Sequence, residues 1–504
     1  MPFTTNINSF RNVPKYQTIT FNNGASNALF VAKYNPEGKV LWNSRMLTSN
    51  TTYLITNMST DVSNNLYVSG WFTRGTNIND QGLFVYNADG TLARNLSGPS
   101  NSTAIGYFLR YDRSGSNDYG NTFTSSINVR GIAATTNRSM FTALNYGTTF
   151  IQYGVTTIAS GLSGSGGALV FLDSAGNFQW IARMFCATAG GVAYCNYLVT
   201  DRTNAYVACD FTPAASATLF TISNYGGGGV DISRIGSTSS GDVCLIRFNN
   251  SGSYVWASKM GGTGYDTASA LAIDASANVI IGGTAGTTAM SFFNSAETAT
   301  ITYTAPTGLG LYGFLAKYNG STGAPVWATY ILDGNIYNIT CDASNNVYVS
   351  GYYSNSNIQF YNASAGRALF ATLSNYSPLT TVGFIAKYDM DGVGQWAFRT
   401  VSSNSGGVSS YHATTLDGVI YNVAGFSTSV NVLNLNGTTL RSLSSSGGAD
   451  GFLARYNRDV SGAWVTTVGG STNQTFISVA TDGTGNVIVG GSYPSGTQSI
   501  LNNT

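Results

Sequence analysis

The sequence predicts an all-β fold made of seven copies of one four-stranded antiparallel unit. Three landmarks support this prediction, and they return in the same order about every 70 residues. The first is an aromatic or apolar residue that ends a strand, found at Tyr34, Tyr111, Leu172, Phe248, Tyr318, Tyr388 and Tyr456. The second stands eight or nine residues later and is Trp in all copies but one: Trp42, Tyr119, Trp180, Trp256, Trp327, Trp396 and Trp464. The third is an Asp-to-Asn turn, clearest at Asp61–Asn65, Asp274–Asn278, Asp342–Asn346 and Asp482–Asn486.

One copy, residues 314–351, shows how these landmarks map onto strands. FLAKY reads as a strand, a Gly-containing turn follows, and the next strand carries Trp327. A third and a fourth strand flank the turn that begins at Asp342. Four-stranded antiparallel units repeated radially are typical of a β-propeller, whose sheets pack face to face. The sequence therefore predicts a single seven-bladed β-propeller, with the Trp and Tyr rings filling the seams between blades.

The beginning of the chain differs from the rest. Residues 1–18 are predicted to form an irregular arm, because Pro2 and Pro14 stand in a stretch without alternation of apolar and polar residues. Residues 19–504 are predicted to form the propeller. Its first hairpin turns at Pro-Glu-Gly, and the next turns at Asp61–Asn65, where the side chains can hydrogen-bond their own backbone.

Long connections separate the Y-V-x-G strand of one copy from the F-x-A-K-Y strand of the next. Residues 352–383 and 426–451 are examples, and structureless loops of that length are uncommon inside a compact domain. The motifs SFFN (291–294), IQFYN (358–362) and VLNLNG (432–437) recur in them. We interpret these motifs as a continued strand or a short extra strand along the rim.

The two ends of the chain are complementary. The chain opens with an F-x-A-K-Y strand and a Trp strand, and it finishes with the two strands that flank an Asp turn, ISVATD and NVIVGG. Pairing of these N- and C-terminal strands would complete one blade and close the ring, leaving no open edge. Either ITFNNG (19–24) or the final SILNN could fill the last rim position, and the sequence does not decide between them.

The composition limits the classes of partner. Charged residues make up 9% of the chain and the formal net charge is +1, so no basic field is available to attract nucleic acid or an anionic membrane. The N-terminal segment lacks the features of a signal peptide, and no apolar run is long enough to span a membrane. The 13% of aromatic residues supplies ample surface to bury.

The five cysteines leave two alternatives open. Four of them, Cys186, Cys195, Cys209 and Cys244, crowd into the third and fourth copies, and Cys341 follows. One alternative is a local disulfide such as Cys186 with Cys195. The favoured alternative is that the cysteines are buried free thiols. The sequence contains no C-x-x-C motif, so it gives no indication of a zinc site.

Candidate chemical groups are few, and we nominate no catalytic, cofactor-binding or metal-binding residue. A basic residue recurs in six copies, at Lys33, Arg110, Arg247, Lys317, Lys387 and Arg455. A ring of cations around an anion is one interpretation; the favoured one is that each head meets a turn acid such as Asp342 or a nearby carbonyl. Each Asp turn offers too few carboxylates for a calcium loop and is interpreted as turn stabilisation. His412, the single histidine, is expected to be a packed or rim residue.

The motifs FVAKYNPEGKVLW, DASNNVYVSG and GGADGFLARYN resemble the seven-bladed β-propeller repeat (SBBP) family. The resemblance covers nearly all of the chain after the arm, and is strong in copies one, five, six and seven but weak in copies two and three. It implies a propeller with surface or particle-associated interaction roles, and it supplies no catalytic residues. Similar repeats occur in bacterial surface proteins and in proteins of large DNA viruses.

Together these observations predict a non-enzymatic structural or interaction protein. The expected partners are proteins in an assembly, bound by the flat faces or rim loops, and the expected location is an extracellular surface or a virus particle. A carbohydrate-binding, lectin-like propeller is the alternative, which would need exposed Trp or Tyr at equivalent rim positions. A propeller lyase or hydrolase is less favoured, because the chain has one His and few carboxylates.

Overall fold

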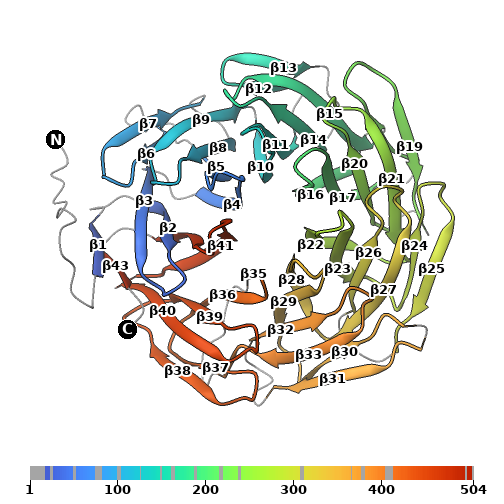
Figure 1. Cartoon of the computed structure of the whole chain (residues 1–504). Coiled ribbons are helices and arrows are strands. Elements are labelled where there is room, and N and C mark those ends of the chain that lie inside the picture. Colours follow the sequence, from blue (N-terminus) through green and yellow to red (C-terminus); the bar gives the residue numbers. More distant parts are fainter. Residues whose placement is uncertain are drawn as a thin grey trace.

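In the computed structural model the chain is built of β-strands arranged in sheets around a central axis (Figure 1). The structure describes residues 18–22, 27–48, 53–73, 82–98, 104–124, 126–147, 150–160, 165–186, 190–214, 219–235, 240–306, 312–364, 366–375, 381–402, 412–470, 472–493 and 497–501. None of these segments forms a helix long and apolar enough to cross a lipid bilayer.

Six sheets contain six strands each, and each is named here by its innermost strand. The β41 sheet runs outward through β41 (Thr475–Thr481), β42 (Val487–Tyr493), β2 (Asn27–Tyr34), β3 (Val40–Thr48), β6 (Leu83–Tyr86) and β7 (Leu92–Leu96). The β4 sheet contains β4 (Tyr53–Thr60), β5 (Leu66–Phe72), β8 (Ile105–Tyr111), β9 (Asn117–Thr124), β12 (Phe150–Tyr153) and β13 (Thr156–Ser160). The β10 sheet contains β10 (Ile127–Ala134), β11 (Met140–Tyr146), β14 (Gly166–Leu172), β15 (Phe178–Cys186), β18 (Leu219–Ser223) and β19 (Gly229–Ser233).

The other three six-stranded sheets follow the same order. The β16 sheet contains β16 (Val192–Thr200), β17 (Ala205–Thr212), β20 (Asp242–Phe248), β21 (Tyr254–Gly261), β24 (Ala289–Phe293) and β25 (Ala299–Thr304). The β22 sheet contains β22 (Thr267–Ile273), β23 (Val279–Ala285), β26 (Tyr312–Tyr318), β27 (Pro325–Leu332), β30 (Asn357–Tyr361) and β31 (Leu369–Ser374). The β35 sheet contains β35 (His412–Leu416), β36 (Val419–Phe426), β39 (Asp450–Tyr456), β40 (Gly462–Gly470), β43 (Thr497–Leu501) and β1 (Thr18–Asn22).

Two smaller sheets bring the total among the described residues to eight rather than the expected seven. The β28 sheet has four strands, β28 (Asn335–Cys341), β29 (Val347–Tyr353), β32 (Val382–Tyr388) and β33 (Gly394–Arg399). The other has three, β34 (Val401–Ser402), β37 (Ser429–Leu433) and β38 (Thr439–Ser444). Only Thr400 separates β33 from β34; its N–H donates to the carbonyl of Gly383 and its carbonyl accepts from Leu433 N, each at 2.9 Å. The main chain of Thr400 therefore connects the two smaller sheets.

The prediction of four-stranded units was wrong. Five sheets have six strands because a long connection contains a hairpin that extends the sheet outward, as β24 and β25 do, whereas the β35 sheet is extended by β43 and β1. The recurring SFFN, IQFYN and VLNLNG motifs fall on the inner strand of such a hairpin, at β24, β30 and β37. The predicted extra rim strand is confirmed in these copies, and the second strand of each pair was missed.

Strands from the two ends of the chain share two sheets. β2 pairs antiparallel with β42, and β43 pairs with both β40 and β1. The two segments that were alternatives for one rim position therefore occupy adjacent positions, β43 inside and β1 outside. Thr18 already belongs to β1, and the rest of the predicted arm, residues 1–17, lies outside the described residues.

The seams between sheets carry the predicted aromatic rings. Five of the recurrent Trp side chains are at most 6% exposed, and Trp396 is half-buried. Five indole N–H groups each donate to a carbonyl of the next sheet: Trp42 to Arg113, Trp180 to Asn250, Trp256 to Gly320, Trp327 to Met390 and Trp464 to Pro36. Tyr119, which replaces Trp in the second copy, donates through its hydroxyl to Gly176 in the same way. The prediction that these rings fill the seams is confirmed.

Candidate functional site

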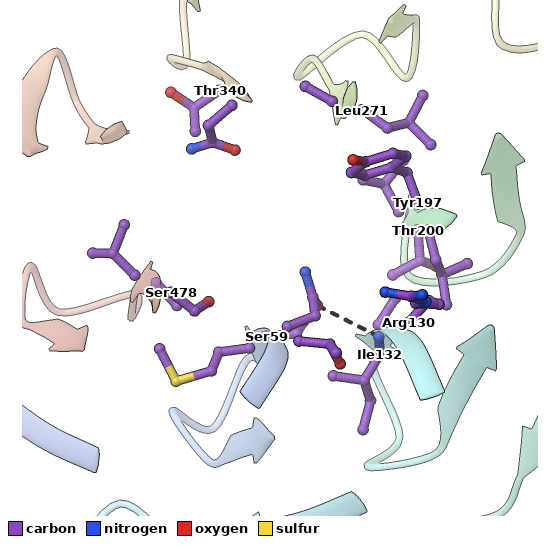
Figure 2. A pocket seen from close by; sticks show the side chains of 18 of the residues that line it. Ser59, Arg130, Ile132, Tyr197, Thr200, Leu271, Thr340 and Ser478 are labelled. Atoms are coloured by element: carbon purple, nitrogen blue, oxygen red, sulfur yellow. Dashed lines mark hydrogen bonds between the residues drawn. The ribbon is translucent and has the colours of Figure 1, made fainter. Parts of the chain in front are cut away.

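A cavity of about 820 Å³ lies at the axis of the molecule. Its described walls come from the innermost strands β4, β10, β16, β22, β28 and β41 and from the turn after β16. Figure 2 shows side chains from these separate strands, among them Arg130, Tyr197 and Ser478, pointing into the same space. A cavity of this size is within the range of ligand-binding pockets.

Each of these six innermost strands carries a β-bulge at the same place. The register of pairing with the second strand shifts by one residue in β4, β10, β16, β22, β28 and β41. The extra residues are Thr56, Arg130, Asn196, Ser269, Tyr337 and Ile477, and all six line the cavity. We call these six residues the bulge ring. In β35 the corresponding stretch precedes His412 and lies outside the described residues. Bulges redirect side chains and are common beside binding sites.

The charges of the cavity are of one sign among the described residues. Its only charged lining residues there are Arg130 and Arg202, and the remaining ones carry hydroxyl, amide or apolar side chains. One acid, Asp210, contacts the bulge ring from outside the cavity lining: Asn196 Nδ2 donates to it at 3.2 Å. Burial raises the pKa of Asp210 to about 7, so this carboxyl group is only partly ionised at neutral pH.

The recurrent basic residues do not line the cavity. Lys33 forms an ion pair with the turn acid Asp482 at 2.7 Å, and Lys317 pairs with the turn acid Asp274 at 2.8 Å. Arg247 donates to the carbonyl of Gly320 at 3.1 Å. The prediction that these heads meet turn acids or carbonyls is confirmed for these residues, and an axial ring of cations is excluded for them.

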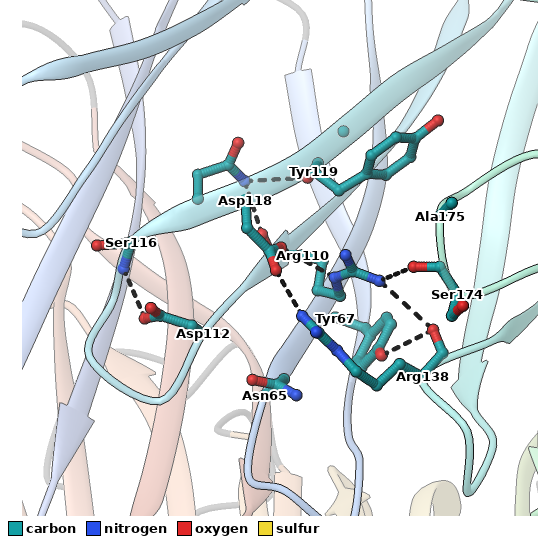
Figure 3. A network of polar contacts seen from close by, with 12 residues as sticks. Asn65, Tyr67, Arg110, Asp112, Ser116, Asp118, Tyr119, Arg138, Ser174 and Ala175 are labelled. Atoms are coloured by element: carbon teal, nitrogen blue, oxygen red, sulfur yellow. Dashed lines mark hydrogen bonds and ion pairs between the residues drawn. The ribbon is translucent and has the colours of Figure 1, made fainter.

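The prediction is also confirmed for Arg110, which donates to a carbonyl, whereas Lys387 and Arg455 contact other groups. Lys387 lies over the Tyr348 ring at 5.2 Å, and Arg455 donates to Asn457 at 3.0 Å. Arg110 joins two sheets (Figure 3): it pairs with Asp118 at 2.9 Å within the β4 sheet and donates to the carbonyl of Ser174 in the β10 sheet at 2.6 Å. These contacts are structural, because they hold neighbouring turns together.

The Asp turns are stabilised by their own side chains, as predicted. Asp342 Oδ1 accepts from the backbone N–H groups of Ser344 and Asn346 at 2.9 and 3.0 Å, and Oδ2 accepts from Tyr348 at 3.0 Å. Burial alone would raise the pKa of Asp342, but the hydrogen bonds from Asn346 hold it below its ordinary value. Among the described residues no three His, Cys, Asp or Glu side chains gather as in a metal site.

The preference for free thiols was wrong for two cysteines. Cys195 and Cys209 form a disulfide, because the register of β16 and β17 places them directly opposite each other. The alternative Cys186–Cys195 pairing is not formed. Cys186, Cys244 and Cys341 are free, and burial raises the pKa of Cys186 to about 11. His412 begins β35, and its side chain lies outside the described part of the chain.

Sequence reasoning missed the bulge ring, although the chain contains a signal for it. Each ring residue stands five positions before the first residue of its turn, for example Thr56 before Asp61 and Tyr337 before Asp342. A register shift between two strands is invisible in either strand alone, so only an alignment of the copies on their turns would have found these positions.

Sheets arranged radially around an axial cavity define this chain as an all-β propeller. No protein-family model matches the chain. It is 24% identical over 449 residues to an uncharacterized WD repeat-containing protein of Acanthamoeba polyphaga mimivirus. The match covers 85% of this chain, but the chain spans only 28% of that relative's length.

Two solved structures to which the chain is similar are as follows. The Dos1 propeller has a TM-score of 0.41 and 12% identity, covering 96% of this chain and 93% of that one. Sqt1 of Chaetomium thermophilum, bound to the N-terminus of the ribosomal protein L10, has a TM-score of 0.28 and 11% identity. That comparison covers 73% of this chain and 94% of Sqt1.

Proposed function

We propose that the chain is a non-enzymatic interaction scaffold, a rigid β-propeller that binds protein partners through its axial cavity and the faces around it. The bulge ring carries this proposal, because it brings six different side chains from six strands to one cavity on a repeated frame. Around the ring the described lining offers hydroxyl and amide groups, which suit polar, wet protein interfaces.

The proposal includes a closed ring of seven blades. Consecutive innermost strands contact each other in the order β4, β10, β16, β22, β28, β35 and β41, and β41 contacts β4. Counting the two smaller sheets as one interrupted blade, joined at Thr400, is consistent with the sevenfold repeat of the sequence. The pairing of β2 with β42 supports closure by the two chain ends.

We extend the proposal to membership of the SBBP repeat family and to a location on a surface or in a virus particle. The repeat motifs support the family assignment, and the viral source of the WD repeat-containing relative supports the particle location. The carbohydrate-binding alternative gains no support, because the recurrent Trp side chains are buried in the seams rather than displayed as stacking platforms. No second function is proposed.

The test is to isolate the full-length chain from its native source after mild chemical cross-linking and to map the cross-links by mass spectrometry. The expected result is a protein partner at fixed stoichiometry, with its cross-links confined to one mouth of the cavity. Heat-unfolded chain serves as the control for non-specific capture. Recovery of the chain alone, with no cross-link near either mouth, would contradict the scaffold proposal, and the protein content of purified particles tests the location.

A further inference from the structure

The bulge ring differs from the rest of the repeat in one respect. The turn acids and the seam aromatics recur from copy to copy, because each copy makes the same structural demand at those positions. The bulge positions are also geometrically equivalent, yet they hold Thr, Arg, Asn, Ser, Tyr and Ile. A position that only stabilised the bulge would carry one or two residue types. Variation on a constant frame is what recognition of an asymmetric ligand requires.

Most polar members of the ring already have partners. Thr56 Oγ1 donates to the carbonyl of Val129 at 2.8 Å, which ties β4 to β10. Asn196 bonds Asn145 and Asp210, and Ser269 Oγ donates to Gly282 O at 3.4 Å. These side chains therefore contribute to the walls of the cavity as well as to its lining.

Arg130 is the exception. No hydrogen bond or ion pair joins its guanidinium to another described residue, and its Nε is buried without a partner. A buried donor left unsatisfied costs free energy, and a guanidinium presents two parallel N–H groups that match a carboxylate. The second cavity arginine, Arg202, lies on the neighbouring β16 sheet, so an acidic group at Arg130 meets a wall of favourable sign.

We infer that the bulge ring binds an acidic peptide segment of a protein partner, with a carboxylate of that segment seated against Arg130. This inference rests on the proposed scaffold function and names the chemistry of its partner. A peptide fits better than a single small anion, because the cavity of about 820 Å³ also presents the 40% exposed ring of Tyr337 and the apolar Ile477. These groups contact the body of a peptide and have no role around an isolated ion.

The test measures binding of fluorescein-labelled octaglutamate to the full-length chain by fluorescence anisotropy, with octaglutamine as the neutral probe. We expect saturable octaglutamate binding that weakens with salt, and at least tenfold weaker binding by Arg130→Gln. Arg113→Gln removes an exposed charge away from the cavity and should bind like the unmodified chain. Arg130→Glu should lose octaglutamate and gain octalysine binding, which shows that the variant is folded and that the site reads charge.

Other outcomes overturn the inference. Equal binding by the unmodified chain and Arg130→Gln would place the site elsewhere, and equal binding of octaglutamine would remove the charge requirement. Full displacement of octaglutamate by a stoichiometric amount of inorganic phosphate would assign the site to a small anion. A cross-linked partner retained at full affinity by Arg130→Gln would overturn this inference alone and leave the scaffold function standing. Octaglutamate binding without any native partner would overturn the scaffold function and leave only an anion-binding cavity at Arg130.

Discussion

At the residue scale, five seams among the described residues have an indole or phenol ring that rests on a glycine of the next sheet. A Cβ on Gly323 would come within 2.7 Å of the Trp256 ring, and the residue also has a φ of +71°. The same arrangement joins Trp42 to Gly115, Tyr119 to Gly176, Trp180 to Gly252 and Trp327 to Gly392. The glycine is thus required both by its backbone conformation and by the ring that covers it.

Gly323→Ala is therefore expected to destabilise the fold by roughly 2–3 kcal/mol, from backbone strain plus the clash with Trp256. Gly227→Ala separates these contributions, because Gly227 has a φ of +102° but nothing within 4 Å of the added Cβ. Gly366→Ala has neither problem and should be neutral. Urea unfolding monitored by Trp fluorescence measures all three. Equal losses for Gly323→Ala and Gly227→Ala would show that the ring contact contributes nothing.

A second residue-scale prediction concerns two buried acids at the seam between the β16 and β22 sheets. Asp242 and Asp266 are fully buried, and their carboxylate oxygens lie against the same glycine, Gly261. Burial, reinforced by Asp266, raises the pKa of Asp242 to about 7, despite a hydrogen bond from Ile235 N and the opposing charges of Lys259 and Arg234. Because the pKa is raised on folding, stability is greatest below the ordinary Asp pKa and falls until the pH passes about 7.

Asp242→Asn keeps the shape of the side chain but cannot ionise. We therefore compare the free energy of unfolding of Asp242→Asn with that of the unmodified chain. From pH 4 to pH 8 this difference should shift by roughly 2–4 kcal/mol in favour of Asp242→Asn. Asp450→Asn is the matched control, because Asp450 holds the equivalent strand position without a neighbouring carboxylate among the groups that shift its pKa. Thermal unfolding between pH 4 and 8 provides the measurement. Parallel stability profiles for Asp242→Asn and the unmodified chain would contradict the prediction.

At the element scale, the inner strand of an outer hairpin could be predicted from the sequence, but the outer strand could not. The inner strand β24 has an alternating burial pattern, with Met290 and Phe292 fully covered, so its SFFN motif was recognisable. The outer strand β25 buries only Tyr303, with Ile301 half-buried, and its other residues are exposed. An outermost strand has one neighbour and little core to face, so it lacks the hydrophobic period from which strands are predicted.

These hairpins nevertheless belong to the core. Phe292 packs against Tyr303 at 5.6 Å and against Phe314 of β26, in the adjacent β22 sheet, at 6.2 Å. Phe292→Ala should therefore cost about 3–5 kcal/mol, as for any large aromatic removed from a packed interior. Val155→Ala, at a hairpin turn where the side chain is 97% exposed, should change stability by less than about 0.5 kcal/mol. If both substitutions changed the free energy of unfolding equally little, the outer hairpins would not contribute to the stability of the four inner strands.

At the scale of the whole molecule, the repeat was enough to predict a propeller but not the lining of its axial cavity. The architecture follows from landmarks that each copy repeats, such as Trp256 and the Asp274 turn, because a repeat array uses the same packing between neighbours along its length. The cavity depends instead on what differs between copies. Arg130 and Tyr337 are not unusual within their own strands, and only pairing and assembly bring them to one space.

Strands from the C-terminal segment pair with strands from the beginning of the chain, and this pairing can be tested by truncation. Deleting residues 471–504 removes β41, β42 and β43, which leaves β2 and β40 each with one open edge, β1 without a partner and Lys33 without Asp482. Unpaired apolar edges are templates for association, and the buried Lys33 would lose its counter-charge. The truncated chain should therefore aggregate or unfold without a cooperative transition, as measured by light scattering after size exclusion and by calorimetry.

Deletion of residues 1–17 preserves every described strand pair and should leave the transition unchanged. Addition of the 471–504 segment as a separate peptide should restore a monomeric, cooperatively unfolding species, since closure depends on strand pairing rather than on chain continuity. A truncated chain that stayed monomeric with an unaltered transition would mean that the ring does not need its ends.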